Sequence, residues 1–401
     1  MPVTSLRLTE AAHVFWVFLR LGLTSFGGPV AHLGYFHDTF VLRRRWLSAT
    51  AYADLVALCQ FLPGPASSQV GMAIGLQRAG HAGALAAWLG FTLPSAVLMM
   101  VAAVGLARYG ALLPAGLLQG LKLAAVAVVA QAVWGMAGSL CRTRLQWLLM
   151  AGTASVVLLL PGAITQLLAL TAAGVIGWHG LQAPLPPVEA EAPGHAFSRR
   201  GGAGWLLGLG LLLMGLPLWA HGSGNPAVAV FDAFFRTGSL VFGGGHVVLP
   251  LLEAEVVRPG WVGSTPFLAG YSLAQAVPGP LFTFAAFLGA AMPEPLGGWR
   301  GGILCLVAIF LPSFMLVAGV WPFWARLRGR KDVRAVLGGV NAAVVGLLVA
   351  AFYQPVWTGA VHQAADFVVV LLAGVLLMML RWPAWSVVGL AGLTGWLAGL
   401  F

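Results

Sequence analysis

Charged side chains are scarce in this sequence. Only 8% of its 401 residues are Asp, Glu, Lys or Arg, whereas 60% are hydrophobic and the mean hydropathy is +0.91. A soluble domain carries roughly 25% charged residues, so the composition excludes an ordinary soluble protein. Residues 82–106 and 111–140 form apolar runs long enough to cross about 30 Å of hydrocarbon as helices. We therefore predict an all-α integral membrane protein.

Cysteine is also scarce, and so are the usual signatures of an enzyme. The three cysteines, Cys59, Cys141 and Cys305, lie apart and form no Cys-x-x-Cys or Cys/His cluster, which argues against redox chemistry and a metal site. The apolar segments contain no paired carboxylates and no nucleophile triad, and the chain has no phosphate-binding Gly-x-x-x-x-Gly-Lys motif. We expect no cofactor and no enzymatic activity, which leaves gradient-driven transport as the leading class.

Acidic residues are few relative to basic ones, 11 against 21, which gives a net charge of +10. In a soluble protein this excess would suggest a nucleic-acid partner. Here the cations lie mostly in short loops, where the tendency of cytoplasmic loops to collect Lys and Arg explains them. We expect no nucleic-acid partner, a surrounding lipid bilayer, and a multi-pass location in a bacterial inner membrane. Nothing in the sequence specifies an oligomeric state.

The chain contains one pattern twice. Each copy places an arginine, a glycine cluster and a Pro-Gly-Pro within apolar sequence. The matched elements, 215 or 216 residues apart, are Arg20 with Arg236, Phe26-Gly27-Gly28 with Phe242-Gly243-Gly244, and Pro63-Gly64-Pro65 with Pro278-Gly279-Pro280. Such self-similarity indicates a duplicated domain. We predict a first membrane repeat at 1–180, a cytoplasmic linker at 181–204, an extra transmembrane helix at 205–227 and a second repeat at 228–401.

A single extra helix between the copies turns the second copy upside down in the membrane. The loop charges agree with this inversion. The loop after the first apolar segment carries Arg43-Arg44-Arg45 in the first copy, and its counterpart in the second copy carries Glu253-Ala254-Glu255 with only Arg258. The basic stretch 326–334 of the second copy has a nearly neutral counterpart in the first. The alternation predicts inverted repeats, which are common in secondary transporters. The broken segments either re-enter on one side or cross fully as interrupted helices, and both arrangements stay open.

Each Pro-Gly-Pro predicts a helix break near the middle of the membrane. The prolines of Pro63-Gly64-Pro65 interrupt helical hydrogen bonding, and the glycine between them permits a sharp reversal. The helix that follows begins with free N–H groups and about +0.5 of partial charge, which together favour an anion. Ser67 and Ser68 lie in its first turn, and Gln60 lies about one turn before Pro63.

These arguments define a set of predicted substrate-binding residues, which lie at the breaks or occupy matched positions deep in apolar runs. The set is Arg20, Ser25, Gly27, Gly28, Gln60, Pro63, Gly64, Ser67, Ser68, Lys122, Arg236, Gly243, Gly244, His246, Gln275, Gly279 and Asn341.

Alternatives accompany several of these residues. Gly-Pro breaks also produce ordinary kinks and close helix contacts, and Arg20 near a helix end is also compatible with snorkelling. Asp54 is a candidate proton carrier or a partner of Arg20. His32 and His246 each fit a packed, hydrogen-bonding role better than a proton relay.

Phe-Gly-Gly-Pro with Leu-Pro-Gly-Pro in the first copy, and Phe-Gly-Gly-Gly-His with Val-Pro-Gly-Pro in the second, resemble the chromate ion transporter family, in its long two-domain form. The resemblance covers both copies. It implies export of chromate, resistance to chromate, and an interaction with sulfate as a chemical analogue. A sulfate or other oxyanion transporter and an anion channel are the alternatives, and protons are a candidate coupling ion.

Overall fold

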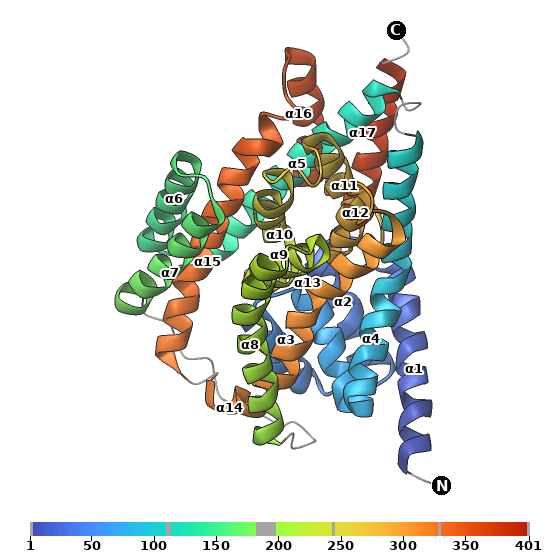
Figure 1. The fold of residues 1–401 in the computed structure, drawn as a ribbon, viewed down its shortest axis with the longest axis vertical. Coiled ribbons are helices and arrows are strands. Elements are labelled where there is room, and N and C mark those ends of the chain that lie inside the picture. Colours follow the sequence, from blue (N-terminus) through green and yellow to red (C-terminus); the bar gives the residue numbers. More distant parts are fainter. Residues whose placement is uncertain (1–2, 110–113, 182–197, 243–244, 328–329, 399–401) are drawn as a thin grey trace.

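The computed structural model describes residues 3–109, 114–181, 198–242, 245–327 and 330–398 (Figure 1). All regular secondary structure within these ranges is helical. The first repeat consists of α1 (Val3–Thr24), α2 (Gly28–His37), η1 (Asp38–Arg43), α3 (Ala49–Phe61), α4 (Ala66–Tyr109), α5 (Ala115–Leu140), α6 (Arg144–Leu159) and α7 (Ala163–Gly180). The second consists of α9 (Pro226–Leu240), η3 (Gly245–Val247), α10 (Val248–Leu252), η4 (Glu253–Val257), α11 (Ser264–Ala276), η5 (Leu281–Thr283), α12 (Phe284–Ala291), α13 (Gly298–Val320), η6 (Trp321–Phe323), α14 (Trp324–Leu327), α15 (Lys331–Ala351), η7 (Phe352–Trp357), α16 (Ala364–Met378) and α17 (Ala384–Ala398).

Between the repeats lies α8 (Arg199–Ser223), the predicted extra helix. It begins at Arg199, inside the stretch predicted as linker, because its glycines allow it to pack closely on α13. The Cα of Gly202 faces the carbonyl of Gly319 so closely that a Cβ at Gly202 would lie 2.8 Å from that oxygen. Residues 182–197 of the predicted linker lie outside the described residues.

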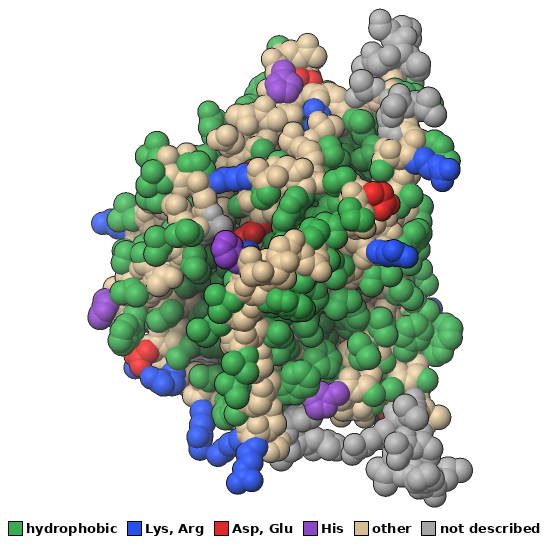
Figure 2. All heavy atoms as spheres, viewed as in Figure 1, with side chains coloured by type: hydrophobic (Ala, Val, Ile, Leu, Met, Phe, Trp, Pro, Cys, Tyr) green, Lys and Arg blue, Asp and Glu red, His purple; other side chains and the backbone are tan. Residues whose placement is uncertain are grey.

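Five of the described helices are long and apolar enough to span a membrane. They are Ala66–Tyr109, Gly116–Leu140, Arg199–Ser223, Gly298–Phe323 and Lys331–Trp357. Hydrophobic side chains cover much of the visible surface between the two ends in Figure 2, as expected for contact with lipid tails. The chain is therefore a multi-pass membrane protein, as its composition predicts.

The two repeats run in opposite directions. In Figure 1, α4 ends near the top beside the C-terminus, whereas its counterpart α13 ends at the bottom, where α14 follows it. Lys and Arg side chains gather at this lower end, around the starts of α8 and α15 (Figure 2). The exposed basic residues of these segments include Arg199, Arg200, Arg326, Arg330 and Lys331. By the positive-inside rule, this distribution predicts that the lower end faces the cytoplasm.

Helices of the two repeats pack against each other. Helix α5 packs on α17 of the other repeat, and α15 packs on α7 in the same way. Glycines permit both contacts, since a Cβ at Gly120 would collide with the carbonyl of Ala391 and one at Gly339 with the carbonyl of Ala173. Gly120 and Gly339 are matched positions of the duplication. Small residues that allow backbones to approach are typical of helix contacts within membranes.

Candidate functional site

The first repeat is interrupted twice, at the predicted positions. Helix α1 ends at Thr24, and Gly27, with φ of 101°, precedes α2. Helix α3 ends at Phe61, and α4 begins at Ala66 after Gly64, whose φ of 121° excludes most other residues. A further kink at Ala79 and Gly80 divides α4 into two helical parts.

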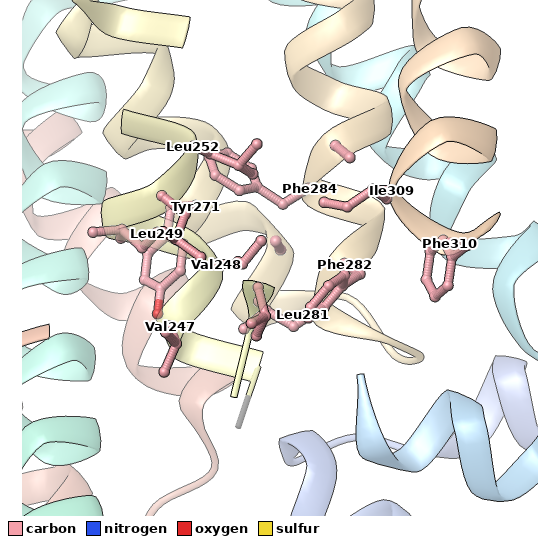
Figure 3. Packing of buried hydrophobic residues seen from close by; sticks show 14 of the residues in the cluster. Val247, Val248, Leu249, Leu252, Tyr271, Leu281, Phe282, Phe284, Ile309 and Phe310 are labelled. Atoms are coloured by element: carbon pink, nitrogen blue, oxygen red, sulfur yellow. The ribbon is translucent and has the colours of Figure 1, made fainter. Parts of the chain in front are cut away.

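The second repeat is interrupted at the matched places. Helix α9 ends at Leu240, and α11 ends at Ala276 before Gly279, which has φ of 102°. The predicted residues Gly243 and Gly244 lie outside the described part of the chain. Figure 3 shows the packing beside this break, where Leu281 and Phe282 lie among buried apolar side chains of neighbouring elements.

The breaks of one repeat bond to the breaks of the other. The amide of Gly64 donates to the carbonyl of Val241 at 2.6 Å, and the amide of Gly279 donates to the carbonyl of Ser25 at 2.9 Å. Val241 and Ser25 are matched positions, as are the two glycines. The four interruptions therefore meet at one place in the interior, related by the approximate two-fold symmetry of the duplication.

A serine from the opposite repeat lies against each Pro-Gly-Pro. A Cβ at Gly64 would collide with Oγ of Ser313, and a Cβ at Gly279 would lie 2.7 Å from Oγ of Ser95. Gln69, one turn into α4, donates to the carbonyl of Pro63 at 2.6 Å and to Oγ of Ser313 at 3.4 Å. These contacts fix the shape of the break and surround it with polar atoms.

The break of the first repeat retains unused hydrogen-bonding capacity. Oγ of Ser25, Oγ of Ser68 and Oε1 of Gln69 are buried and have no hydrogen-bond partner among the described residues. The first amides of α4 precede its internal hydrogen-bond ladder and add donors and a favourable dipole at the same point. His32 is buried beside them, with Nδ1 3.4 Å from Oγ of Ser67 and Nε2 3.2 Å from the carbonyl oxygen of Ser25.

At the break of the second repeat, the polar side chains that the structure describes find partners within that repeat. Thr283, which matches Ser68, donates to the carbonyl of Pro280 at 2.9 Å. Nδ1 of His246 lies 2.8 Å from the hydroxyl of Tyr271 and 3.4 Å from Nε2 of Gln275. In Figure 3 the hydroxyl of Tyr271 points toward the segment that carries Val247, next to this histidine. The free polar atoms are thus concentrated in the first repeat's break.

The matched arginines have different surroundings. Arg236 forms ion pairs with Asp232 at 3.0 Å and with Glu255 at 3.0 Å, so two carboxylates occupy its guanidinium. Arg20 forms no ion pair with any described residue and lines a cavity between α1, α2 and η1. Asp54, a candidate partner of Arg20, instead accepts a hydrogen bond from Nε1 of Trp324 at 3.1 Å.

Three predicted residues lie away from these contacts. Nζ of Lys122 donates to the carbonyl of Gly359 at 3.3 Å and thereby supports the loop after η7 of the other repeat. Gln60 is exposed at the end of α3, and Asn341 is half-buried in α15. Neither amide hydrogen-bonds to a residue that the structure describes. The glutamine that holds the break is Gln69, which sequence analysis missed.

Comparison with known proteins connects this geometry to a family. The sequence matches the family described as chromate transporter over residues 12–178 and again over residues 228–396. This chain belongs to the chromate transporter family. The two matched regions each contain one glycine cluster and one Pro-Gly-Pro, and they leave α8 between them.

Named relatives match most of this family member. It is 28% identical to a chromate transport protein of Pseudomonas aeruginosa, over 84% of this chain and 78% of the relative. It is 27% identical to a chromate transport protein of Cupriavidus metallidurans, over 83% and 80%, and 26% identical to a probable chromate transport protein of Synechococcus elongatus, over 89% and 87%. No solved structure matches the chain.

Proposed function

We propose that this protein exports chromate across the bacterial inner membrane and so confers resistance to chromate. The anion binds at the break of the first repeat, between the start of α4 and the end of α1. The names of the relatives support the substrate, and the polar atoms at the crossed breaks support the place.

The observation that carries the proposed site is the pair of unpartnered hydroxyls. Ser25 is fully buried and Ser68 is 2% exposed, and neither Oγ has a partner among the described residues. Leaving a buried hydroxyl unsatisfied costs about 1–3 kcal/mol, so such groups are expected where a ligand completes them. A tetrahedral dianion offers four acceptor oxygens to these hydroxyls and to the free amides of α4.

The membrane potential supports the outward direction. Each charge that crosses 100 mV gains or loses about 2.3 kcal/mol, so an inside-negative potential favours exit of a dianion by about 4–5 kcal/mol. Export therefore needs no further energy source, whereas uptake would require more than two co-transported cations. Protons are a candidate coupling ion within this scheme.

Expression in a chromate-sensitive bacterium tests the proposal. Cells with the wild-type chain should accumulate less chromate and grow at higher chromate concentrations than cells with Ser25→Ala/Ser68→Ala. Ser155→Ala, whose hydroxyl bonds within α6, is the matched control and should behave as wild type. Equal accumulation in all strains and in cells that lack the protein, with equal amounts of the variants in the membrane, would contradict the function.

Sulfate or another tetrahedral oxyanion is the alternative substrate, because it presents the same charge and shape to the same donors. Competition in proteoliposomes separates these anions. Chromate flux that saturates and that sulfate inhibits only at much higher concentration assigns chromate as the substrate. Flux that does not saturate with either anion would indicate a channel.

A further inference from the structure

A cavity of about 720 Å³ lies between α1, α2 and η1 of the first repeat. Its polar lining includes Arg20, Arg43, Arg44 and His13, and it reaches Thr24, the residue before the buried Ser25. Arg43 and Arg44 are exposed and belong to the basic loop that the positive-inside rule places in the cytoplasm. The cavity therefore leads from the cytoplasmic side toward the proposed anion site.

The charges of this cavity are only partly balanced. Arg43 pairs with Asp38 at 2.8 Å, and Asp38 carries the one carboxylate among the described lining residues. Arg44 donates to Nε2 of His13 at 2.9 Å, a contact that leaves the positive charge of the guanidinium in place. Arg20 has no carboxylate partner within the described ranges. The lining thus carries three arginines against one aspartate.

The matched arginine of the second repeat is neutralised by residues that the first repeat lacks. Asp232 and Glu255 hold Arg236, and both positions lie 216 residues after positions that line the cavity, Trp16 and Thr39. The duplication has therefore kept the arginine twice but surrounds it with carboxylates in one copy only. Two carboxylates around one guanidinium leave a net charge of −1, which repels an anion.

We propose that the cavity around Arg20 is the capture site for the oxyanion on the cytoplasmic side, and that Asp232 and Glu255 close the equivalent approach on the opposite side. This inference rests on the proposed function. It adds a difference in charge between the approaches from the two sides of the membrane. A cleft lined by charge of one sign raises the local concentration of an oppositely charged substrate and its rate of association. The asymmetry favours entry from the cytoplasm whatever the coupling.

The test introduces into the first repeat, in the full-length chain, the two carboxylates that surround the matched arginine of the second repeat. Trp16→Asp/Thr39→Glu gives Arg20 the partners that Arg236 has. Uptake of radiolabelled chromate by inside-out vesicles should then show KM raised about tenfold or more, with kcat nearly unchanged, because capture is lost and the inner site is intact. Arg20→Ala should give the same change, and Arg20→Lys should restore most of the affinity.

The reciprocal variant, Asp232→Asn/Glu255→Gln, frees Arg236. It should lower KM for chromate that enters from the opposite face, measured in right-side-out vesicles. Arg200→Ala removes an exposed cation at the cytoplasmic end but outside the cavity, and serves as the control that should leave KM unchanged in both orientations.

Two outcomes separate this inference from the proposed function. Wild-type vesicles that carry no oxyanion would overturn the proposed function and the capture site with it. Wild-type transport together with an unchanged cytoplasmic KM in Arg20→Ala and in Trp16→Asp/Thr39→Glu would overturn the capture site alone. The amount of folded protein in each vesicle preparation, measured by size-exclusion of the extracted chain, normalises every rate.

Discussion

The amide of Gly64 donates a hydrogen bond of 2.6 Å to the carbonyl of Val241, which lies in the other repeat. The matched bond, from Gly279 to Ser25, has a length of 2.9 Å. Each Pro-Gly-Pro therefore completes its backbone hydrogen bonding with the end of the first helix of its partner repeat. The interrupted helices are held at a common crossing point, and the unpaired polar atoms of the first repeat lie there.

Replacing the serines should weaken binding and leave the fold intact. Ser68→Ala removes a buried hydroxyl that has no partner in the described structure, so without ligand the free energy of unfolding should be unchanged or higher, by up to about 1–3 kcal/mol. Hydrogen bonds to a charged ligand contribute about 1.5–3 kcal/mol, so chromate affinity should fall by about tenfold or more. Titration calorimetry on the purified protein measures the affinity. An unchanged affinity in both Ser68→Ala and Ser25→Ala would remove these hydroxyls from the site.

Gly64→Ala should destabilise the crossing. The added Cβ requires a strained φ and collides with Oγ of Ser313, which together cost about 2 kcal/mol or more. Gly105→Ala is the matched control, because Gly105 is helical and a Cβ there meets nothing within 4 Å. The control should be neutral or slightly stabilising. Thermal denaturation in detergent compares the two, and equal melting temperatures would contradict the strain at Gly64.

Replacing Gln69 should lower stability and chromate binding, whereas replacing Gln60 should have little effect on either. Gln69→Leu leaves the carbonyl of Pro63 without its donor inside the protein and should cost about 1–3 kcal/mol of stability. Gln60→Leu changes an exposed side chain and should stay within about 0.5 kcal/mol of wild type. Denaturation and chromate binding should rank the variants in the same order. A stronger effect of Gln60→Leu on either measurement would restore Gln60 as the glutamine of the site.

Replacing Arg236 should lower stability, whereas replacing Arg20 should impair transport and leave stability nearly unchanged. Arg236→Ala leaves Asp232, which is 5% exposed, without its cation and should cost about 2–4 kcal/mol, less than a fully buried pair because Arg236 is one-third exposed. Arg20→Ala breaks no ion pair among the described residues and should change stability by less than about 0.5 kcal/mol while raising KM. Denaturation midpoints measured beside transport rates distinguish the two. Equal loss of stability would mean that Arg20 is structural.

The helix breaks could be predicted from sequence because proline and glycine act on their own backbone. Their positions at Pro63-Gly64-Pro65 and Pro278-Gly279-Pro280 agree with the structure. The repeats and their inversion were equally accessible, since loop charge and duplication are visible without coordinates. The hydrogen-bond partners of the breaks could not be predicted from sequence, because Gly64 and Val241 belong to different repeats and meet only through packing.

The side-chain contacts also divide into those that the sequence predicts and those that depend on packing. An aspartate four residues before Arg236 on one helix is a sequence signal for an ion pair, and it was available. The pairing of Arg236 with Glu255 could not be predicted in this way, since Glu255 approaches from a separate element. Gln69 carried a weaker signal, as a glutamine in the first turn after the break that reaches back to Pro63. Lys122 was predicted as a site residue because of its depth, and the structure places its Nζ against a backbone carbonyl of the other repeat.

The reciprocal bonds also bear on how such a chain is built. A half-molecule consisting of the first repeat would leave the amide of Gly64 in the apolar interior without its acceptor, the carbonyl of Val241. It would also lack α15 and α17, the helices on which its own α7 and α5 pack. The unit that folds is therefore the antiparallel pair, and α8 is the connection that allows one gene to supply both orientations.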